Sequence, residues 1–187
     1  MTWKDALVST AKEILQTALI SLGIFLFVYV FLVQPHRVQG VSMEPTFENG
    51  ELLLTEKISY KLSRPQRGDV IVFEAPVERK ADFIKRIIGL PGEHVEIKDG
   101  NIYIDELKID EPYINVPTLG TIDVTLGGDE LFVLGDNRGA SSDSRSFGSI
   151  KKKTLKGKVW LVYWPIFKKA TFEGARIISN VPYSVPN

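Results

Sequence analysis

A charge-free apolar run near the N-terminus limits what this chain can fold into more than any other feature. Residues 14–33 contain no Asp, Glu, Lys or Arg and consist mainly of Leu, Ile, Val and Phe. As a helix rising about 1.5 Å per residue, the run spans about 30 Å, the thickness of the hydrocarbon core of a bilayer. The sequence therefore predicts a transmembrane helix over residues 14–33, which divides the chain into residues 1–13, the span and residues 34–187.

A cleaved secretory leader is the alternative interpretation of this run. The apolar region of a leader has about 7–15 residues and ends at a small-residue cleavage site, whereas here the run is longer and no such site follows. We therefore interpret it as a retained anchor. Lys4 and Lys12 precede the run and only Arg37 follows closely, so the positive-inside rule places residues 1–13 in the cytoplasm and residues 34–187 outside.

Composition excludes several function classes. The 187 residues carry a formal net charge of zero, which argues against nucleic acid as the main partner. The chain has no cysteine, so disulfides, thiol catalysis and cysteine-ligated metals are excluded. With only two histidines, a histidine-based zinc site is not expected.

From residue 50 onward, short apolar runs alternate with turn signals, a pattern typical of β-strands. Strands are expected over residues 51–55, 70–73, 83–88, 130–134 and 158–165. Residues 95–97 and 102–104 flank an Asp-Gly pair, which predicts a hairpin. Residues 105–130 are rich in Pro, Gly, Asp and Thr and are expected to be irregular, with one strand over 121–126. The predicted fold class is mostly β: one N-terminal transmembrane helix followed by a compact antiparallel β-sheet domain.

Ser42 is the first candidate for chemistry, in the segment Val-Ser-Met-Glu-Pro-Thr that follows the anchor. The short link from Val33 to Ser42 spans at most about 30 Å, so any catalysis would take place close to the membrane. A serine hydroxyl is a weak nucleophile at neutral pH and requires a base. His36 and His94 could complete a Ser-His-Asp arrangement, but nothing in their local setting distinguishes them from surface histidines.

Lys85 is the other candidate base. On a strand, Phe83, Lys85 and Ile87 share one face, so the amine lies between apolar neighbours. Burial on such a face lowers the pKa of a lysine by several units from about 10.4, which would let neutral Lys85 take the proton of Ser42. The alternative is that the Lys85 side chain extends along the apolar surface and leaves its ammonium in water.

The loop over residues 135–148 is rich in small and turn-forming residues. As a plain tight loop, it would have Asp136 and Asn137 bonded to their own backbone. It also contains Asp143 and Arg145, which could form a bidentate ion pair. A hydroxyl such as that of Ser141 could orient the neutral amine of the candidate lysine.

These segments together resemble the motifs of the type I signal peptidases, the membrane-bound Ser-Lys proteases that remove signal peptides from exported proteins. The motifs are Ser-Met-Glu-Pro-Thr at 42–46, Gly-Asp-Val-Ile-Val-Phe at 68–73, Lys-Arg-Ile-Ile-Gly-Leu-Pro-Gly at 85–92, and Gly-Asp-Asn-Arg through Ser-Asp-Ser-Arg at 135–145. They occur in the family's order behind the anchor. A lysine at position 85 and a single span resemble the Gram-positive prokaryotic members.

The resemblance implies a role for each matching residue. Ser42 would be the nucleophile and Lys85 the general base. Ser141 would orient the lysine amine, while Asp143 and Arg145 would hold the loop. The resemblance implies no metal and no cofactor.

The resemblance also implies the substrate and the cellular location. Val38 and Ile84 match positions that line pockets for the small side chains of an Ala-x-Ala cleavage site. Gly40 stands where some relatives carry a serine that helps the oxyanion hole, which leaves the Ser42 backbone N–H for that task. The partners would be exported preproteins and the lipid bilayer, at the outer face of the plasma membrane.

Two rival hypotheses remain at this stage. One is a Ser-Lys protease that cleaves itself or a regulator, a class that carries a DNA-binding domain where this chain has its apolar run. The other is a membrane-tethered β domain that binds exported chains without hydrolysis, in which Lys85 is merely structural.

Overall fold

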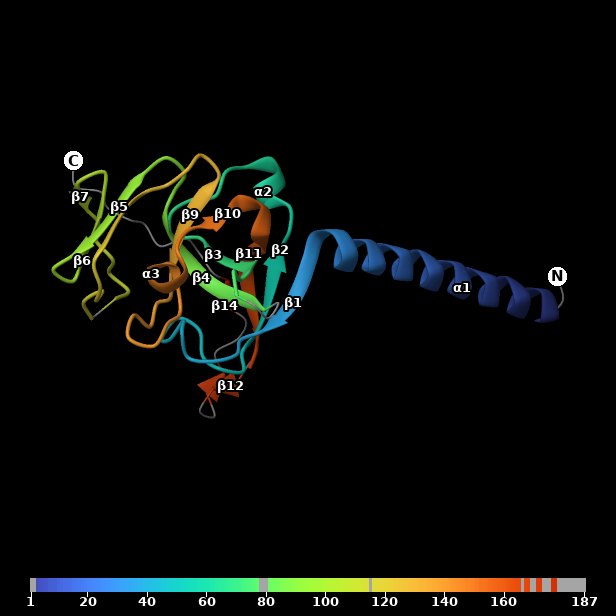
Figure 1. Ribbon diagram of the computed structural model, residues 1–187. Coiled ribbons are helices and arrows are strands. Elements are labelled where there is room, and N and C mark those ends of the chain that lie inside the picture. Colours follow the sequence, from blue (N-terminus) through green and yellow to red (C-terminus); the bar gives the residue numbers. More distant parts are fainter. Residues whose placement is uncertain are drawn as a thin grey trace. The chain divides into compact units, whose positions relative to one another are not determined.

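The computed structural model describes residues 3–77, 81–114, 116–165, 167–168, 171–172 and 176–177 (Figure 1). The chain divides into two compact units, Met1–Gln34 and Pro35–Asn187, and each is described by itself. Residues 1–2 of the predicted N-terminal segment and residues 178–187 of the predicted domain lie outside the described residues.

The first unit is a helix. Helix α1 (Trp3–Phe27) continues into a π-helical turn, η1 (Val28–Leu32). It begins within the segment predicted to precede the span, and Val33, the last residue of the predicted span, is already extended. Pro35 accounts for this end, because proline cannot donate to a helix and disfavours helical backbone in the residue before it.

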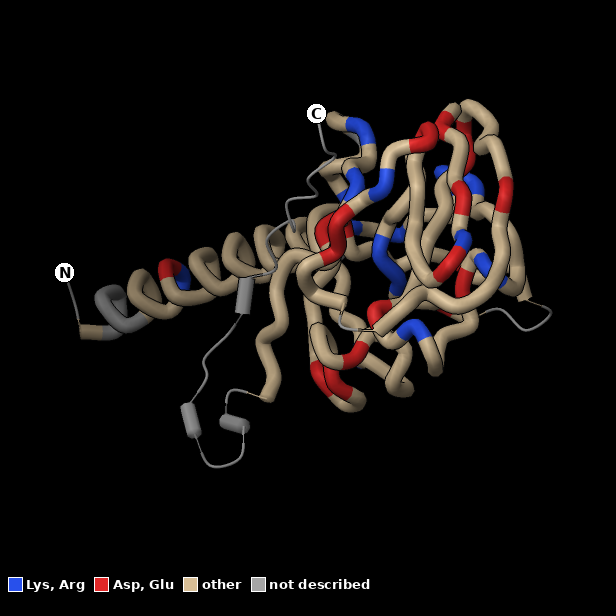
Figure 2. Tube along the Cα trace, turned by 90° about the vertical axis from the view of Figure 1, so that its left-hand side faces the viewer, with Lys and Arg blue, Asp and Glu red and all other residues tan. Residues whose placement is uncertain are grey.

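From Ile14 to its end, α1 carries no charged side chain. Its segment Val8–Phe27 has the length and composition of a membrane span, and none of it is buried. Figure 2 shows charged residues on the described part of this helix only near its start. A helix that is apolar all round requires an apolar environment, either a protein core or a membrane.

The second unit is built mostly of antiparallel strands, which confirms the predicted fold class. Its largest described sheet has the order β1-β2-β11-β3-β4-β9-β10, with β14 also paired to β11. The strands of this sheet are β1 (Val33–Arg37), β2 (Leu52–Glu56), β3 (Val70–Glu74), β4 (Asp82–Gly89), β9 (Glu130–Leu134), β10 (Ile150–Lys151), β11 (Leu155–Trp164) and β14 (Arg176–Ile177). Short helical turns lie between them: α2 (Ser59–Leu62), α3 (Ser144–Phe147) and η2 (Lys152–Thr154).

Two smaller sheets complete the described strands. One has the order β7-β6-β5-β8 and consists of β5 (His94–Lys98), β6 (Asn101–Ile104), β7 (Leu107–Lys108) and β8 (Ile122–Thr125). The other pairs β12 (Phe167–Lys168) with β13 (Thr171–Phe172). The predicted hairpin is present as β5–β6, and Asp99 and Gly100 at its tip both have positive φ, as a two-residue turn of this kind requires.

The core explains how strand β4 is held. Ile87 packs with Phe73 and Leu131 on one side of the large sheet, whereas Ile88 packs with the hairpin residues of the smaller sheet. A third cluster, which includes Val38, Met43 and Phe47, lies under the turn that follows β1. Strand β4 is therefore held on both faces, and the turn is packed onto the same body.

Candidate active site

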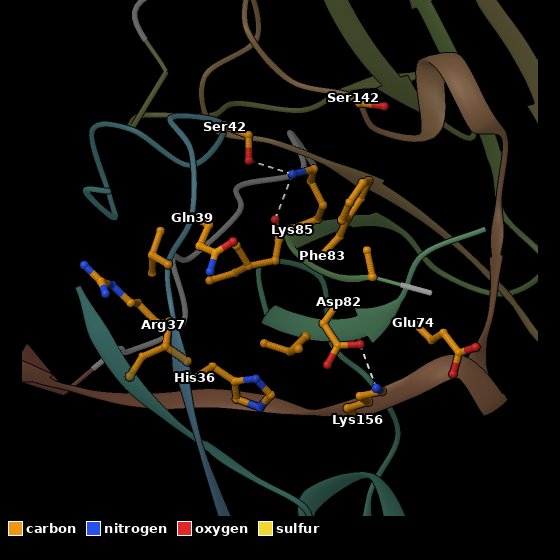
Figure 3. A pocket seen from close by; sticks show the side chains of 15 residues that line it. His36, Arg37, Gln39, Ser42, Glu74, Asp82, Phe83, Lys85, Ser142 and Lys156 are labelled. Atoms are coloured by element: carbon orange, nitrogen blue, oxygen red, sulfur yellow. Dashed lines mark hydrogen bonds and ion pairs between the residues drawn. The ribbon is translucent and has the colours of Figure 1, made fainter. Parts of the chain in front are cut away.

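The hydroxyl of Ser42 and the amine of Lys85 are in hydrogen-bond contact. Lys85 Nζ lies 2.7 Å from Ser42 Oγ and 2.9 Å from the carbonyl oxygen of Ile84. Figure 3 shows the two side chains meeting in one pocket. Ser42 lies in the turn after β1 and Lys85 in the middle of β4, so the fold brings together the two residues that the sequence suggested as a pair.

Burial changes the chemistry of Lys85. Its side chain is 3% exposed, and Nζ lies 5.4 Å from the ring centre of Phe83. Desolvation lowers the pKa of Lys85 from 10.5 to about 8, although the charges of Asp143 and Asp136 oppose this change. With such a pKa, about one amine in ten is neutral at pH 7, compared with about one in 2,500 for a free lysine. Lys85 does not extend its ammonium into water.

The pocket lies along an unpaired strand edge. Strand β3 pairs with β4 over residues 82–86, but β9 pairs only with residues 86–89. Within the described part of the chain, residues 82–85 therefore have no strand on their second edge. They line a pocket of about 630 Å³ together with residues 36–39, and both Val38 and Ile84 are among its lining residues.

The two histidines are not placed to activate Ser42. His36 lines the same pocket, but its Nε2 lies 3.1 Å from Thr55 Oγ1, and burial lowers the pKa of His36. His94 lies on β5 and pairs with Asp123 at 2.9 Å. No hydrogen bond among the described residues joins either histidine to Ser42, and no group of three His, Cys, Asp or Glu side chains among them could hold a metal.

The predicted ion pair of the 135–148 loop is present. Arg145 Nε and Nη2 each donate a 2.9 Å hydrogen bond to one oxygen of Asp143, which is fully buried. Burial by itself raises the pKa of Asp143, but hydrogen bonds from Arg145 and from the Gly135 N–H outweigh it and hold the pKa below its usual value. Asp143 is therefore an anion at neutral pH.

Ser141 lies beside the turn that carries Ser42. Its hydroxyl is buried next to Gly135, whose Cα also faces the carbonyl oxygen of Ser42. None of the hydrogen bonds between described residues joins Ser141 Oγ to Lys85 Nζ. The lysine-orienting role of Ser141 stays a prediction.

Gly135 leads to a testable prediction. A Cβ at this position would lie 2.5 Å from the Ser42 carbonyl oxygen and closer still to Ser141 Oγ, so Gly135→Ala must displace the turn that carries Ser42. Misplacement of a catalytic group by about 1 Å costs about 100-fold in rate, and we expect a loss of that order. The measurement is kcat for a peptide substrate. Gly139→Ala is the matched control, because a Cβ there meets nothing within 4 Å, and equal rates for the two variants would contradict the prediction.

Sequence reasoning missed the contacts that hold this loop against Ser42 and Lys85. Asp136 does not bond its own backbone through its side chain: it accepts hydrogen bonds of 2.9 and 2.6 Å from Arg86, the residue next to Lys85. The Asn137 side chain likewise donates to the backbone of Val41, and its backbone N–H donates to Ser42, while its own carbonyl accepts from Ala140 N–H within the loop. The only signal in the sequence was the presence of these polar side chains in the motif.

The irregular segment over residues 105–130 also supports the loop. Glu111 binds Arg138 through two hydrogen bonds of 2.6 and 2.8 Å, and Thr118 Oγ1 accepts a further hydrogen bond from the same guanidinium. Tyr113 lies under the guanidinium of Arg86, 4.4 Å from ring centre to Cζ. This segment therefore orders the two arginines behind the site.

The arrangement has the parts of a nucleophilic site. A hydroxyl lies within hydrogen-bond distance of an amine whose pKa is lowered toward neutrality, which is the arrangement that activates a serine. The pocket beside the pair is open to an extended chain along the edge of β4.

A protein-family model and several known bacterial proteins match this chain. The family model described as "Signal peptidase, peptidase S26" matches residues 11–164. Signal peptidase I of Bacillus caldolyticus is 40% identical over 159 residues, which covers 77% of this chain and 86% of that protein. Probable signal peptidase I-2 of a Synechocystis species is 36% identical over 171 residues, covering 88% and 75%.

Further relatives come from other bacteria. Signal peptidase IB of Staphylococcus aureus is 33% identical over 176 residues, covering 82% of this chain and 91% of that protein. The crystal structure of a signal peptidase I from Enterococcus faecalis V583 is 34% identical, with a TM-score of 0.47, and the match covers 51% of this chain and 97% of that one. The family model and the relatives extend over most of the chain, so this protein belongs to the signal peptidase family, peptidase S26.

Proposed function

We propose that this chain is a membrane-bound serine endopeptidase that removes N-terminal signal peptides from exported preproteins through a Ser42–Lys85 dyad. The observation that carries the proposal is the 2.7 Å contact between Ser42 Oγ and the amine of Lys85, a residue that is 3% exposed. Family membership supports the substrate class, because the relatives are signal peptidases.

The substrate binds as an added strand. An extended peptide can pair with the free edge of residues 82–85, and such pairing supplies main-chain hydrogen bonds without regard to sequence. Specificity then comes from the pockets for alternate side chains. Val38 is buried and Ile84 half-buried in one apolar cluster, so the pocket floor beside Ser42 favours small side chains such as those of an Ala-x-Ala site.

Cleavage proceeds through an acyl-enzyme. Neutral Lys85 takes the proton of Ser42 as Oγ attacks the carbonyl carbon of the scissile bond, and the oxyanion that forms is stabilised by the Ser42 backbone N–H. The Lys85 ammonium then donates its proton to the leaving amine, and the mature protein departs. Lys85 then deprotonates a water that attacks the ester carbonyl, and it returns that proton to Ser42 Oγ as the signal peptide leaves with a new carboxylate. Asp143, Arg145 and Ser141 support the dyad from the adjoining loop.

The apolar segment anchors the enzyme to the plasma membrane. An exposed helix that is apolar all round is compatible with the interior of a bilayer, and it matches a membrane span in length. Lys4 and Lys12 on its N-terminal side outweigh Arg37, which favours a cytoplasmic N-terminus and a catalytic domain on the outer face. The chain then presents its dyad where exported preproteins emerge.

The test of the proposed function is the pH dependence of peptide cleavage by detergent-solubilised protein. A general base acts when it is neutral, so kcat/KM for an Ala-x-Ala peptide should rise about tenfold per pH unit below the pKa of Lys85 and level off above about pH 8. Mass spectrometry of rapidly quenched reactions should locate the acyl group on the peptide that contains Ser42.

The controls separate this enzyme from its rivals. Ser42→Ala should form no adduct and release no product while keeping the circular-dichroism spectrum of the wild type. A folded wild-type protein that binds preproteins but cleaves none would overturn the proposal in favour of a tethered binding domain. A rate that rises only near pH 10 would contradict the lowered pKa of Lys85.

A further inference from the structure

We infer that Asn137 is a positioning residue of the site, which fixes the direction of the Ser42 backbone N–H and thereby builds the oxyanion hole. The inference rests on the proposed function, because it assumes attack by Ser42. Its starting point is that one residue, from a distant part of the chain, binds the backbone on both sides of the nucleophile.

The contacts are two hydrogen bonds. Asn137 Nδ2 donates to the carbonyl oxygen of Val41 at 3.1 Å, and the Asn137 backbone N–H donates to the carbonyl oxygen of Ser42 at 3.0 Å. The Val41 carbonyl also accepts a bond of 3.1 Å from Glu44 N within the turn itself. The side chain of Asn137 is therefore the link between that carbonyl and the 135–148 loop.

Because of peptide geometry, the contact to the Val41 carbonyl also fixes the direction of the Ser42 N–H. The Val41–Ser42 peptide unit is planar and trans, so its C=O and N–H point in opposite directions. A donor that holds the Val41 oxygen on one side directs the Ser42 N–H to the other side. Among the described residues this N–H makes no hydrogen bond, so it is available to a substrate oxyanion.

The position of Asn137 is itself set by the strand of the base. The preceding residue, Asp136, is held by a bidentate pair with Arg86, and Arg86 follows Lys85 on β4. The contacts thus connect strand β4, which carries Lys85, through Asp136 and Asn137 to the turn that carries Ser42. Gly40 has no hydroxyl to offer an oxyanion, so the orientation of the one backbone donor matters more.

The test compares Asn137→Ala and Asn137→Asp with the wild type in the peptide assay. The aspartate variant keeps the shape of the side chain but replaces the Nδ2 donor with an acceptor that repels the Val41 carbonyl. Because removal of an oxyanion donor costs about 100- to 1,000-fold, misorientation of one should lower kcat by about 10- to 100-fold for Asn137→Ala and at least as much for Asn137→Asp. KM should stay within about twofold of the wild-type value, since ground-state binding does not use the oxyanion hole.

Two further readouts distinguish positioning from a merely structural role. The inhibition constant of a peptide aldehyde, whose adduct with Ser42 carries its oxygen in the oxyanion hole, should rise by the same factor as kcat falls. The midpoint of the pH profile for Asn137→Ala should not move, because burial on β4 sets the pKa of Lys85. Asn101→Ala is the matched control: its amide also donates to a backbone carbonyl, that of Asp99 at 2.9 Å, far from the site.

The outcomes separate this inference from the proposed function. If Ser42→Ala and Lys85→Met are inactive and both Asn137 variants keep the wild-type kcat, the inference fails and the proposed function stands. A loss that appears only in KM, or that is matched by Asn101→Ala, also overturns the inference. If Ser42→Ala cleaves like the wild type, the proposed function fails and this inference fails with it.

Discussion

Replacing Lys85 by methionine should abolish cleavage while making the folded domain more stable at pH 7. Methionine has a similar length and no charge, so it removes the base without leaving a large cavity. Loss of the base in a serine protease lowers kcat by about 10⁴-fold or more. Peptide cleavage and thermal unfolding of the same preparation measure the two effects.

The gain in stability follows from the lowered pKa of Lys85. At pH 7 the amine is mostly protonated in both the folded and the unfolded chain, and a folded-state pKa near 8 instead of 10.5 means that burial of the ammonium costs about 3 kcal/mol. This cost is fully present below about pH 8 and disappears as the pH rises toward 10.5. Lys85→Met should therefore unfold at a higher temperature than the wild type at pH 7, and the difference should shrink at pH 10.

Lys98→Met is the matched control for this prediction. Lys98 also lies over an aromatic ring, with Nζ 4.9 Å from the centre of Tyr103, but it is exposed in the β5–β6 hairpin. It should change neither activity nor stability noticeably. Cleavage by a Lys85→Met variant would contradict the assignment of Lys85 as the general base. A variant that is inactive because it is unfolded would contradict the expected gain in stability.

Breaking the Arg86–Asp136 pair should have the largest effect on stability. The two side chains are 2% and 0% exposed and are joined by hydrogen bonds of 2.9 and 2.6 Å. Asp136→Leu leaves a guanidinium buried without its anion, and loss of one partner of such a pair typically costs about 3–5 kcal/mol. Against a total stability of about 5–15 kcal/mol, this is a large fraction, and urea unfolding measures it.

A double variant shows whether the cost comes from the unpaired charge. Arg86→Met combined with Asp136→Leu should recover much of the lost stability, because well-packed apolar residues can replace a buried ion pair. Cleavage should not recover, since the ion pair that holds the 135–148 loop to strand β4 is still missing. Asp129→Leu, which breaks an exposed pair with Lys151, is the control and should hardly change stability. A double variant as unstable as Asp136→Leu alone would contradict the explanation.

Much of the fold could be predicted because it depends on local signals. The β5–β6 hairpin follows from an Asp-Gly pair between alternating apolar residues, and strand β4 from a short apolar run closed by a Pro-Gly turn signal. The end of the N-terminal helix was less predictable. The apolar run continues to Val33, but Pro35 disfavours helical backbone at Gln34, and composition alone does not register this restraint.

The candidate site was predictable only in part. Lys85 could be proposed from its apolar neighbours, since burial of a lysine has a direct chemical consequence. The partners of Asp136, Asn137 and Arg138 could not, because a polar loop residue bonds its own backbone as readily as a distant group. The segment over residues 105–130 gave no sign that Glu111 reaches Arg138, since such a contact depends on the path of the chain.

The short unpaired edge of β4 would make cleavage depend on whether the substrate segment is folded or unfolded. In the described part of the chain, residues 82–85 provide about 13 Å of strand with no partner on one edge, and only a backbone with unused N–H and C=O groups can pair with it. A helix or an already paired strand has none to offer. On the proposed mechanism, an Ala-x-Ala triplet inside a mature, folded protein is ignored, and cutting is confined to the interval in which a newly exported chain has not yet folded.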